Sequence, residues 1–417
     1  MPYNKILIIL SLILFLLFLA INIPSPLKIE GDGVFYYSWL RSALFDHDFN
    51  FYNELNYFST YDVGSKWILD TGFKTYIGKI PNAYAYGTGL AWLPLFALAN
   101  LLSLIFNLPK DGYSFFYVLS VNLSSWLFGL ASLVIVYINL KKIFSARISF
   151  WSSLGIYLAT PWFYYQFFEP SMSHLASLFM VCLFFNFIIK FHQKEKVNLW
   201  LFSSVVFLMV AIRWQNMLFL VTFLPFLLSS RHDFKLLMKR SLSVIGPTLV
   251  FWLTQFVLWK HLYGHYILTP QGRGFMRFDF HGLYILFSTN RGLLLWSPIV
   301  ILSFCGFYFL YKKSKQLFFI SISALVVQWL INGSLNDLGG GDAYGARRFI
   351  ETLPFLSLAL AAFWAKVKNK QLIVAITTIL LVWNMVLIQD YRHGQIPHHG
   401  EFDLLKVNYF KDIIIIN

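Results

Sequence analysis

Charged residues are scarce in this sequence. Only 12% of the 417 residues are Asp, Glu, Lys or Arg, whereas 58% are hydrophobic and 20% are aromatic. The mean hydropathy is +0.62, and one soluble core cannot bury that much apolar surface. The composition therefore excludes an ordinary soluble protein and predicts an integral membrane protein built from α-helices.

Cysteine is also nearly absent. Cys182 and Cys305 both lie inside apolar runs, so the sequence indicates neither a disulfide framework nor a zinc site. The net charge of +14 does not indicate a nucleic-acid partner, because the basic residues form short clusters between apolar runs and no continuous stripe. The run 6–23 resembles a signal-peptide core, but no small-x-small cleavage site precedes Pro24, so we interpret it as the first transmembrane helix.

The basic clusters predict the topology. Two apolar runs separate each cluster from the next, so all five clusters lie on one side, which the positive-inside rule makes cytoplasmic. Of the 19 Asp and Glu residues, only Glu195 and Asp233 fall in these clusters, which leaves 19 − 2 = 17 outside them. The clusters are Lys141/Lys142/Arg147, Lys190/Lys194/Lys196, Arg231/Lys235/Lys239/Arg240, Lys312/Lys313/Lys315 and Lys366/Lys368/Lys370.

This arrangement predicts about 11 transmembrane helices in a single domain, 1–417. The apolar segment 86–106 breaks the parity of crossings, and its Gly87, Gly89 and Pro94 favour a broken, interfacial or re-entrant piece. A count of 12 would require one cluster to break the positive-inside rule. The predicted external segments are 24–112, with juxtamembrane helices, 261–290 and the tail 390–417. Abundant Ile, Phe, Lys and Asn are typical of an AT-rich bacterial genome, so we expect a bacterial cell membrane.

Asp32 is the leading candidate for a catalytic carboxylate. It lies between Gly31 and Gly33, just past the first helix, where an ionised group at a membrane surface is costly and usually functional. Flanking glycines free the backbone for close approach to a ligand, although they also suit an ordinary tight turn. The same loop contains Tyr36 and Asn82, and Lys79 shortly before the apolar segment 86–106. Most of its other acids are expected to be solvated.

Four external arginines form a second group of candidates: Arg213, Arg291, Arg347 and Arg348. A cation at a helix amino terminus opposes the helix dipole, and on the external side it also opposes the positive-inside rule. A membrane-surface phosphate would compensate, because the planar guanidinium binds two oxygens at once. The alternatives are snorkelling to head groups or pairing with Asp337, Asp342 or Glu351.

Weaker signals accompany these two groups. The turn 169–174 contains Glu169 and His174, which could reach the same pocket, although turn chemistry is the simpler interpretation. His261 and His265 lack a carboxylate that would complete a metal site, so a divalent metal has no support. No Walker or dinucleotide motif is present, so a nucleotide cofactor has none either.

Taken in order along the chain, these features resemble the GT-C superfamily of polyprenyl-phosphate-sugar glycosyltransferases, such as protein O-mannosyltransferases and the lipid A aminoarabinose transferase. The similar elements are short. They are the acidic first loop with Asp32, Lys-Ile-Pro-Asn at 79–82, the segment from Gly87 to Pro94, Lys-Lys-Ile-Phe-Ser at 141–145, Arg-Gly-Leu-Leu-Leu-Trp-Ser-Pro at 291–298 and Gly-Ala-Arg-Arg-Phe at 345–349. Family members commonly have Asp-Glu where this chain has Asp32-Gly33, which leaves open whether Glu30 assists.

The resemblance implies a GT-C-like bundle and inverting transfer of a sugar from a polyprenyl-phosphate donor to a glycan, lipid or protein acceptor. Asp32 would be the general base, and Lys79, Arg213 and one or more of the other arginines would bind the lipid phosphate. Two rivals stay open: a transporter or flippase of a lipid-linked or anionic substrate, and a glycan polymerase or ligase that uses a lipid-diphosphate donor. The sequence indicates neither the sugar, nor the acceptor, nor an oligomeric state.

Overall fold

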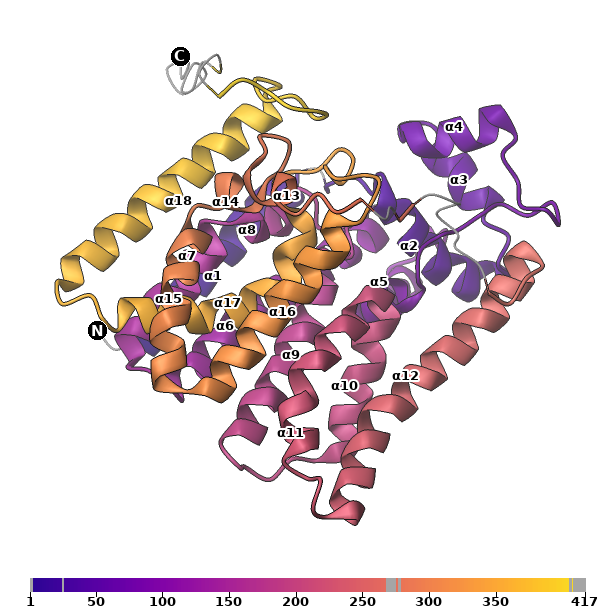
Figure 1. Ribbon diagram of the computed structural model, residues 1–417. Coiled ribbons are helices and arrows are strands. Elements are labelled where there is room, and N and C mark those ends of the chain that lie inside the picture. Colours follow the sequence, from indigo (N-terminus) through magenta and orange to yellow (C-terminus); the bar gives the residue numbers. More distant parts are fainter. Residues whose placement is uncertain (1–2, 25, 268–274, 277–278, 405–406, 408–417) are drawn as a thin grey trace.

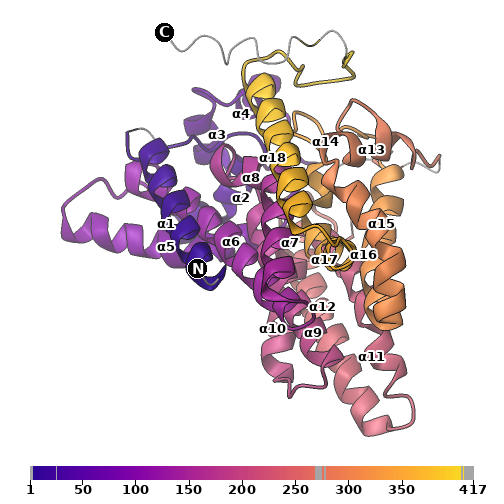
Figure 2. The same ribbon diagram turned by 90° about the vertical axis from the view of Figure 1, so that its left-hand side faces the viewer.

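The structure, a computed structural model, describes residues 3–24, 26–267, 275–276, 279–404 and 407 (Figures 1 and 2). Helices make up 71% of it, and no strand occurs among these described residues, which confirms the all-helical class. Residue 25 of the predicted loop 24–112, residues 268–274 and 277–278 of the predicted loop 261–290, and residues 405–406 and 408–417 of the predicted tail lie outside the described residues.

Seven helices among the described residues are long and apolar enough to cross a membrane by length and composition, which indicates a membrane protein. Large apolar side chains on α1 and α12, including Leu12 and Leu253, are exposed, as expected of surfaces that face lipid. The seven are α1 (Tyr3–Asn22), α5 (Gly87–Ile105), α6 (Phe115–Lys141), α9 (His174–His192), α12 (Phe234–Tyr263), α16 (Lys315–Gly333) and α18 (Lys370–Arg392).

Five of the 11 predicted spans are shorter or interrupted in the structure. They are the apolar runs 148–166, 198–212, 214–230, 291–311 and 348–365. At 14 residues, α10 (Leu199–Ile212) is about 21 Å long, less than the ~30 Å of a bilayer core. Two other predicted spans are divided at a proline, one at Pro161 and one at Pro298, because proline lacks the backbone N–H that a helix interior needs. The pieces are α7 (Ala146–Leu158) with α8 (Pro161–Phe167), 3-10 helix η2 (Trp214–Phe223) with α11 (Leu224–Leu228), α14 (Leu293–Trp296) with α15 (Ile299–Lys313), and 3-10 helix η3 (Arg347–Thr352) with α17 (Leu353–Trp364).

The segment 86–106 forms one continuous helix, α5, despite Pro94. The expectation of a broken piece is therefore wrong: α5 continues through Pro94, although this proline lacks the N–H that would bond to the carbonyl oxygen four residues earlier. In Figure 2 the axis of α5 runs across the direction of α9 and α18. An interfacial course for α5 stays a prediction, because the helix is also long and apolar enough to span a membrane.

Three of the predicted basic clusters meet at one end of the bundle. Lys142 Nζ pairs with Glu195 Oε1 at 2.7 Å, and His192 Nδ1 lies 2.7 Å from Gln316 Oε1. Lys313 Nζ lies over the Phe144 ring, 5.1 Å from its centroid. The chain therefore brings these three clusters to the same end of the bundle.

The predicted first external loop is a compact helical layer with its own core. It contains α2 (Asp32–Arg41), a π-helical turn η1 (Ser42–Asp46), α3 (Tyr52–Phe58) and α4 (Val63–Thr71). Tyr37 and Trp39 of α2 belong to the same buried cluster as Trp92 of α5 and Trp259 of α12. In Figure 1, α3 and α4 project from the bundle on the side where the carboxyl end of α18 also lies.

Glu54 is an exception to the expectation that most acids of this layer are solvated. The side chain of Glu54 is completely buried, and its Oε1 accepts a hydrogen bond from Arg41 Nη1 at 2.9 Å. Arg41 also pairs with Asp46 and donates from Nε to the Asp111 carbonyl oxygen at 3.1 Å. Glu54 is therefore part of a network around Arg41 that also includes Asp46 and Asp111. It is not a solvated loop residue.

Candidate functional site

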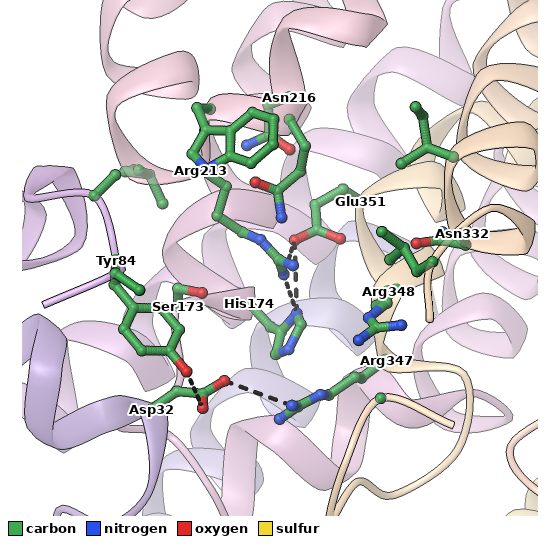
Figure 3. A pocket seen from close by; sticks show the side chains of 18 of the residues that line it. Asp32, Tyr84, Ser173, His174, Arg213, Asn216, Asn332, Arg347, Arg348 and Glu351 are labelled. Carbon is green, nitrogen blue, oxygen red and sulfur yellow. Dashed lines mark hydrogen bonds and ion pairs between the residues drawn. The ribbon is translucent and has the colours of Figure 1, made fainter. Parts of the chain in front are cut away.

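A cavity of about 320 Å³ lies where α2, the junction of α10 and η2, the end of α16 and η3 meet (Figure 3). It contains charged residues from segments that are more than 300 positions apart in the sequence, Asp32 and Arg347 among them. Its polar lining residues are Asp32, Tyr36, Tyr84, Ser173, His174, Arg213, Gln215, Asn216, Gln328, Asn332, Asp337, Arg347, Arg348 and Glu351.

The two glycines beside Asp32 place the carboxylate at this cavity. Gly31 has φ +57°, a left-handed conformation that costs other residues energy, and its N–H donates to Asp62 Oδ1 at 2.7 Å. A Cβ on Gly33 would lie 2.9 Å from the Ser171 carbonyl oxygen, so only glycine allows α2 to pack on the turn 169–173. Asp32 itself occupies the first turn of α2, where the helix dipole favours an anion.

Asp32 has one partner on each carboxylate oxygen. Tyr84 Oη donates to Oδ1 at 2.7 Å, and Arg347 Nη2 lies 3.5 Å from Oδ2 (Figure 3). The Asp32 side chain is 30% exposed. Burial alone would raise the pKa of Asp32, but the charge of Arg347 and the hydrogen bond from Tyr84 outweigh it and hold the pKa below its ordinary value. Asp32 is therefore ionised at neutral pH.

Tyr84 is a site residue that the sequence did not indicate. Asn82 holds its segment, because Asn82 Nδ2 donates to the Phe35 carbonyl oxygen at 2.9 Å and Oδ1 accepts from the Tyr84 N–H at 3.1 Å. The ring of Tyr84 packs edge-on against Tyr36, with centroids 5.0 Å apart. Tyr36 Oη in turn accepts a hydrogen bond from Ser173 Oγ at 3.0 Å. Burial and the adjacent Asp32 charge raise the pKa of Tyr84 well above its ordinary value, so its hydroxyl remains a donor.

Arg213 is held by protein groups on several sides. Its Nη1 donates to Glu351 Oε1 at 3.0 Å and lies 2.6 Å from His174 Nδ1. With the Gln215 amide oriented so that its oxygen faces the guanidinium, that oxygen accepts from Nη2 at 3.0 Å and from Nε at 3.2 Å. Arg213 also follows the last residue of α10, where the dipole favours a cation. Its charge is compensated within the protein.

Arg347 and Arg348 differ in how much of their hydrogen-bonding capacity is used. Arg348 donates from Nη2 to Asp337 Oδ2 at 2.9 Å and from Nη1 to the Asp337 carbonyl oxygen. Arg347 has only the long ion pair to Asp32, and its buried Nη1 has no hydrogen-bond partner among the described residues. The Arg347 side chain is 12% exposed, so water does not readily satisfy this donor. Arg347 is therefore the arginine most available to an anion in the cavity.

The structure brings six of the predicted residues to the cavity wall and leaves five outside it. Those at the wall are Asp32, Tyr36, His174, Arg213, Arg347 and Arg348. Among the others, Glu30 is exposed, and Asn82 acts through its support of Tyr84. Lys79 does not reach the cavity, and its Nζ lies 2.7 Å from His261 Nε2.

Arg291 lies outside this cavity for a clear structural reason. Its guanidinium donates to the carbonyl oxygens of Ala343 at 2.8 Å, Pro397 at 3.0 Å and Gly400 at 3.1 Å, and also to that of His398. Arg291 is 4% exposed. Carbonyl oxygens of the chain after α18 take the place that the sequence interpretation gave to a phosphate.

Glu169 lies behind the cavity wall. Its Oε1 accepts a hydrogen bond from Tyr164 Oη at 2.7 Å, while Oε2 is buried with no partner among the described residues. Burial raises the pKa of Glu169 to about 7, against the opposing effects of Tyr164 and the Arg347 charge. Glu169 thus influences the charges of the site without lining it.

A second, apolar groove of about 600 Å³ lies beside the cavity. It is formed by α2 and η1, α5 and α12, and its lining includes Trp39, Leu90 and Leu253. Consecutive residues line the two spaces: Ala85 lines the cavity and Tyr86 lines the groove. Trp39 Nε1 also donates to the Tyr84 carbonyl oxygen at 2.9 Å, which ties a groove residue to a cavity residue.

Within the described part of the chain, no group of three or more His, Cys, Asp or Glu residues could hold a metal ion. Comparison with protein-family models and with curated proteins finds no match for this chain.

Proposed function

We propose that this protein is an inverting glycosyltransferase that takes a sugar from a polyprenyl-phosphate donor, in line with its resemblance to the GT-C superfamily. The observation that carries the proposal is the placement of Asp32 and Arg347 in one cavity, with a base and an anion-binding group 3.5 Å apart. Transfer from a lipid phosphate needs both: one group to accept a proton and one to stabilise the departing phosphate.

In the proposed reaction, an acceptor hydroxyl oxygen attacks the anomeric carbon of the donor sugar as the bond from that carbon to the phosphate oxygen breaks. The bonding electrons leave with the polyprenyl phosphate, and the hydroxyl proton passes to the Asp32 carboxylate. Attack from the face opposite the phosphate inverts the anomeric configuration. Phosphate leaves readily once its charge is compensated, so no general acid is required.

Through the ion pair between Asp32 and Arg347, binding of the donor would change the basicity of Asp32. With the cavity free of donor, the Arg347 charge contributes to holding the pKa of Asp32 below its ordinary value, which makes the carboxylate a weak base. A donor phosphate that binds the unpartnered Nη1 of Arg347 would share that charge. Asp32 would then become more basic when a donor is present, and so would be activated by the substrate.

The apolar groove supports a lipid-linked donor. A polyprenyl chain has no hydrogen-bonding groups beyond its phosphate, and it could occupy the groove lined by Trp39, Leu90 and Leu253 while the phosphate enters the adjoining cavity. We further propose that the shorter and interrupted helices complete about 11 passes. The cavity would then open on the external face of a bacterial cell membrane, opposite the basic clusters.

Replacing Asp32 with Asn tests this function. The amide oxygen can still accept the hydrogen bond from Tyr84, so Asp32→Asn should fold and bind the lipid phosphate. Loss of the base should lower transfer by about 10²–10⁴-fold, measured in purified protein with a defined polyprenyl-phosphate sugar. Full transfer by this variant would contradict the role of Asp32. A transporter would not form a glycosylated product, and a diphosphate-dependent ligase would not consume a monophosphate donor.

A further inference from the structure

The cavity wall contributed by α16 differs chemically from the wall that contains the arginines. Gln328, Ile331, Asn332 and Leu335 all line the cavity, and their spacing of three, four and seven residues places them along one side of the helix and its immediate end. Phe275 lines the cavity as well, and its carbonyl oxygen accepts from the Asn336 N–H at 2.9 Å. This amide wall, made of Phe275, Gln328, Ile331, Asn332 and Leu335, contains no charged residue.

Two carboxamide residues of the amide wall are largely buried and have unused hydrogen-bonding capacity among the described residues. Gln328 is 4% exposed and Asn332 is 6% exposed. The Nδ2 of Asn332 is buried with no hydrogen-bond partner among the described residues. No described residue forms a hydrogen bond with the Gln328 amide either. In Figure 3, Asn332 lies on the opposite side of the cavity from Tyr84.

A buried donor without a partner, such as Asn332 Nδ2, destabilises a fold, because it has given up water without gaining another partner. An apolar side chain would avoid that cost. Residues that weaken the fold at a cavity are typical of ligand-binding sites, where the bound molecule supplies the missing hydrogen bonds. Each carboxamide offers two N–H donors and one oxygen acceptor, which complements a hydroxyl group that both donates and accepts.

We propose that Gln328 and Asn332 bind the hydroxyl groups of the donor sugar, and that this sugar is uncharged. The inference rests on the proposed glycosyl transfer and specifies the ring that the cavity accepts. A cationic aminosugar would require an available carboxylate, but the amide wall contains none, and the nearby Asp337 is paired with Arg348 at 2.9 Å. An acidic sugar would compete with the phosphate for Arg347.

The test compares Gln328→Leu and Asn332→Leu with a matched control. Gln255→Leu makes the same change at a buried glutamine of α12 that is 2% exposed and does not line the cavity. Each purified protein is titrated with sugar-free undecaprenyl phosphate, with undecaprenyl phosphohexose and with an aminosugar analogue. Thermal unfolding without ligand is recorded in parallel.

The two cavity variants should bind the phosphohexose about tenfold more weakly than the wild type does, because each loses hydrogen bonds to the ring. Their affinity for sugar-free undecaprenyl phosphate should not change, and their unfolding temperatures should be equal or higher. Gln255→Leu should match the wild type in all three titrations. Unchanged phosphohexose affinity in both cavity variants, equal weakening for both lipids, or a preference for the aminosugar donor would overturn the inference.

Failure of the proposed function would give a different pattern. In that case the wild type would bind neither undecaprenyl phosphate nor its glycosylated form, and the amide inference would fail with it. If the wild type binds and uses a glycosylated lipid phosphate while the leucine variants behave identically to it, only the inference about Gln328 and Asn332 is refuted.

Discussion

Replacing Arg347 with Met should separate phosphate binding from stability. Methionine keeps most of the length of the side chain but removes its charge and all of its donors. Among the described residues, Arg347 is paired only with Asp32, through a 3.5 Å contact to a carboxylate that is 30% exposed. The loss of a partly exposed pair such as this should lower the free energy of unfolding by only about 1 kcal/mol.

The expected loss of lipid-phosphate affinity is larger. A hydrogen bond to a charged group contributes about 1.5–3 kcal/mol, which corresponds to roughly a 10- to 100-fold change in the dissociation constant. Arg213→Met should behave in the opposite way. It would leave the Glu351 carboxylate, whose side chain is 4% exposed, without the guanidinium that lies 3.0 Å away. Breaking a buried pair of this kind costs about 3–5 kcal/mol of stability.

The assay is a titration of each purified variant with undecaprenyl phosphate, combined with chemical or thermal unfolding. Arg147→Ala, at an exposed arginine in a basic cluster far from the cavity lining, is the control and should match the wild type in both measurements. The reasoning would be refuted if Arg347→Met bound undecaprenyl phosphate as tightly as the wild type, or if the stability loss were larger in Arg347→Met than in Arg213→Met.

Three further predictions follow from single contacts. Tyr84→Phe removes a hydrogen bond that lowers the pKa of Asp32, so the acid limb of the pH profile for transfer should shift to higher pH; an unshifted limb would contradict the contact. Burial raises the pKa of Glu169 from 4.5 to about 7, so its contribution to stability is complete below pH 4.5 and is lost as the pH rises through 7. Glu169→Gln, which keeps the acceptor for Tyr164, should therefore stabilise the protein at pH 8 by about 3 kcal/mol relative to the wild type and flatten the pH dependence of unfolding between pH 4.5 and 7. Arg291→Met should lower thermal stability but leave the affinity for undecaprenyl phosphate unchanged; weaker binding would return Arg291 to the phosphate site.

The charged part of the cavity was predictable because its residues break general rules. Asp32 is a carboxylate between two glycines just past the first apolar helix, and Arg213, Arg347 and Arg348 are cations in or next to short helices, outside the basic clusters. A cation that breaks such a rule can also be bound by backbone groups of the protein itself. Arg291 bonds to carbonyl oxygens of the chain beyond α18, and those partners become visible only in three dimensions.

The neutral part of the cavity was not predictable from the sequence. Tyr84 is one of 23 tyrosines, and Gln328 and Asn332 are amides in an apolar helix, so none of the three breaks a charge or topology rule. Their importance depends on burial and on missing partners. The sequence also predicted helix continuity only in part: α5 continues through Pro94, whereas Pro161 and Pro298 coincide with breaks.

The central claim is that Asp32 and Arg347 form one site for sugar transfer from a lipid phosphate. The most direct measurement is a reconstitution with purified protein, a defined undecaprenyl phosphohexose and a hydroxyl acceptor, without nucleotide sugar, metal or ion gradient. The proposal predicts release of undecaprenyl phosphate together with a glycosylated product of inverted anomeric configuration, and loss of both in Asp32→Asn. A product with retained configuration, or equal turnover in Asp32→Asn, would contradict it.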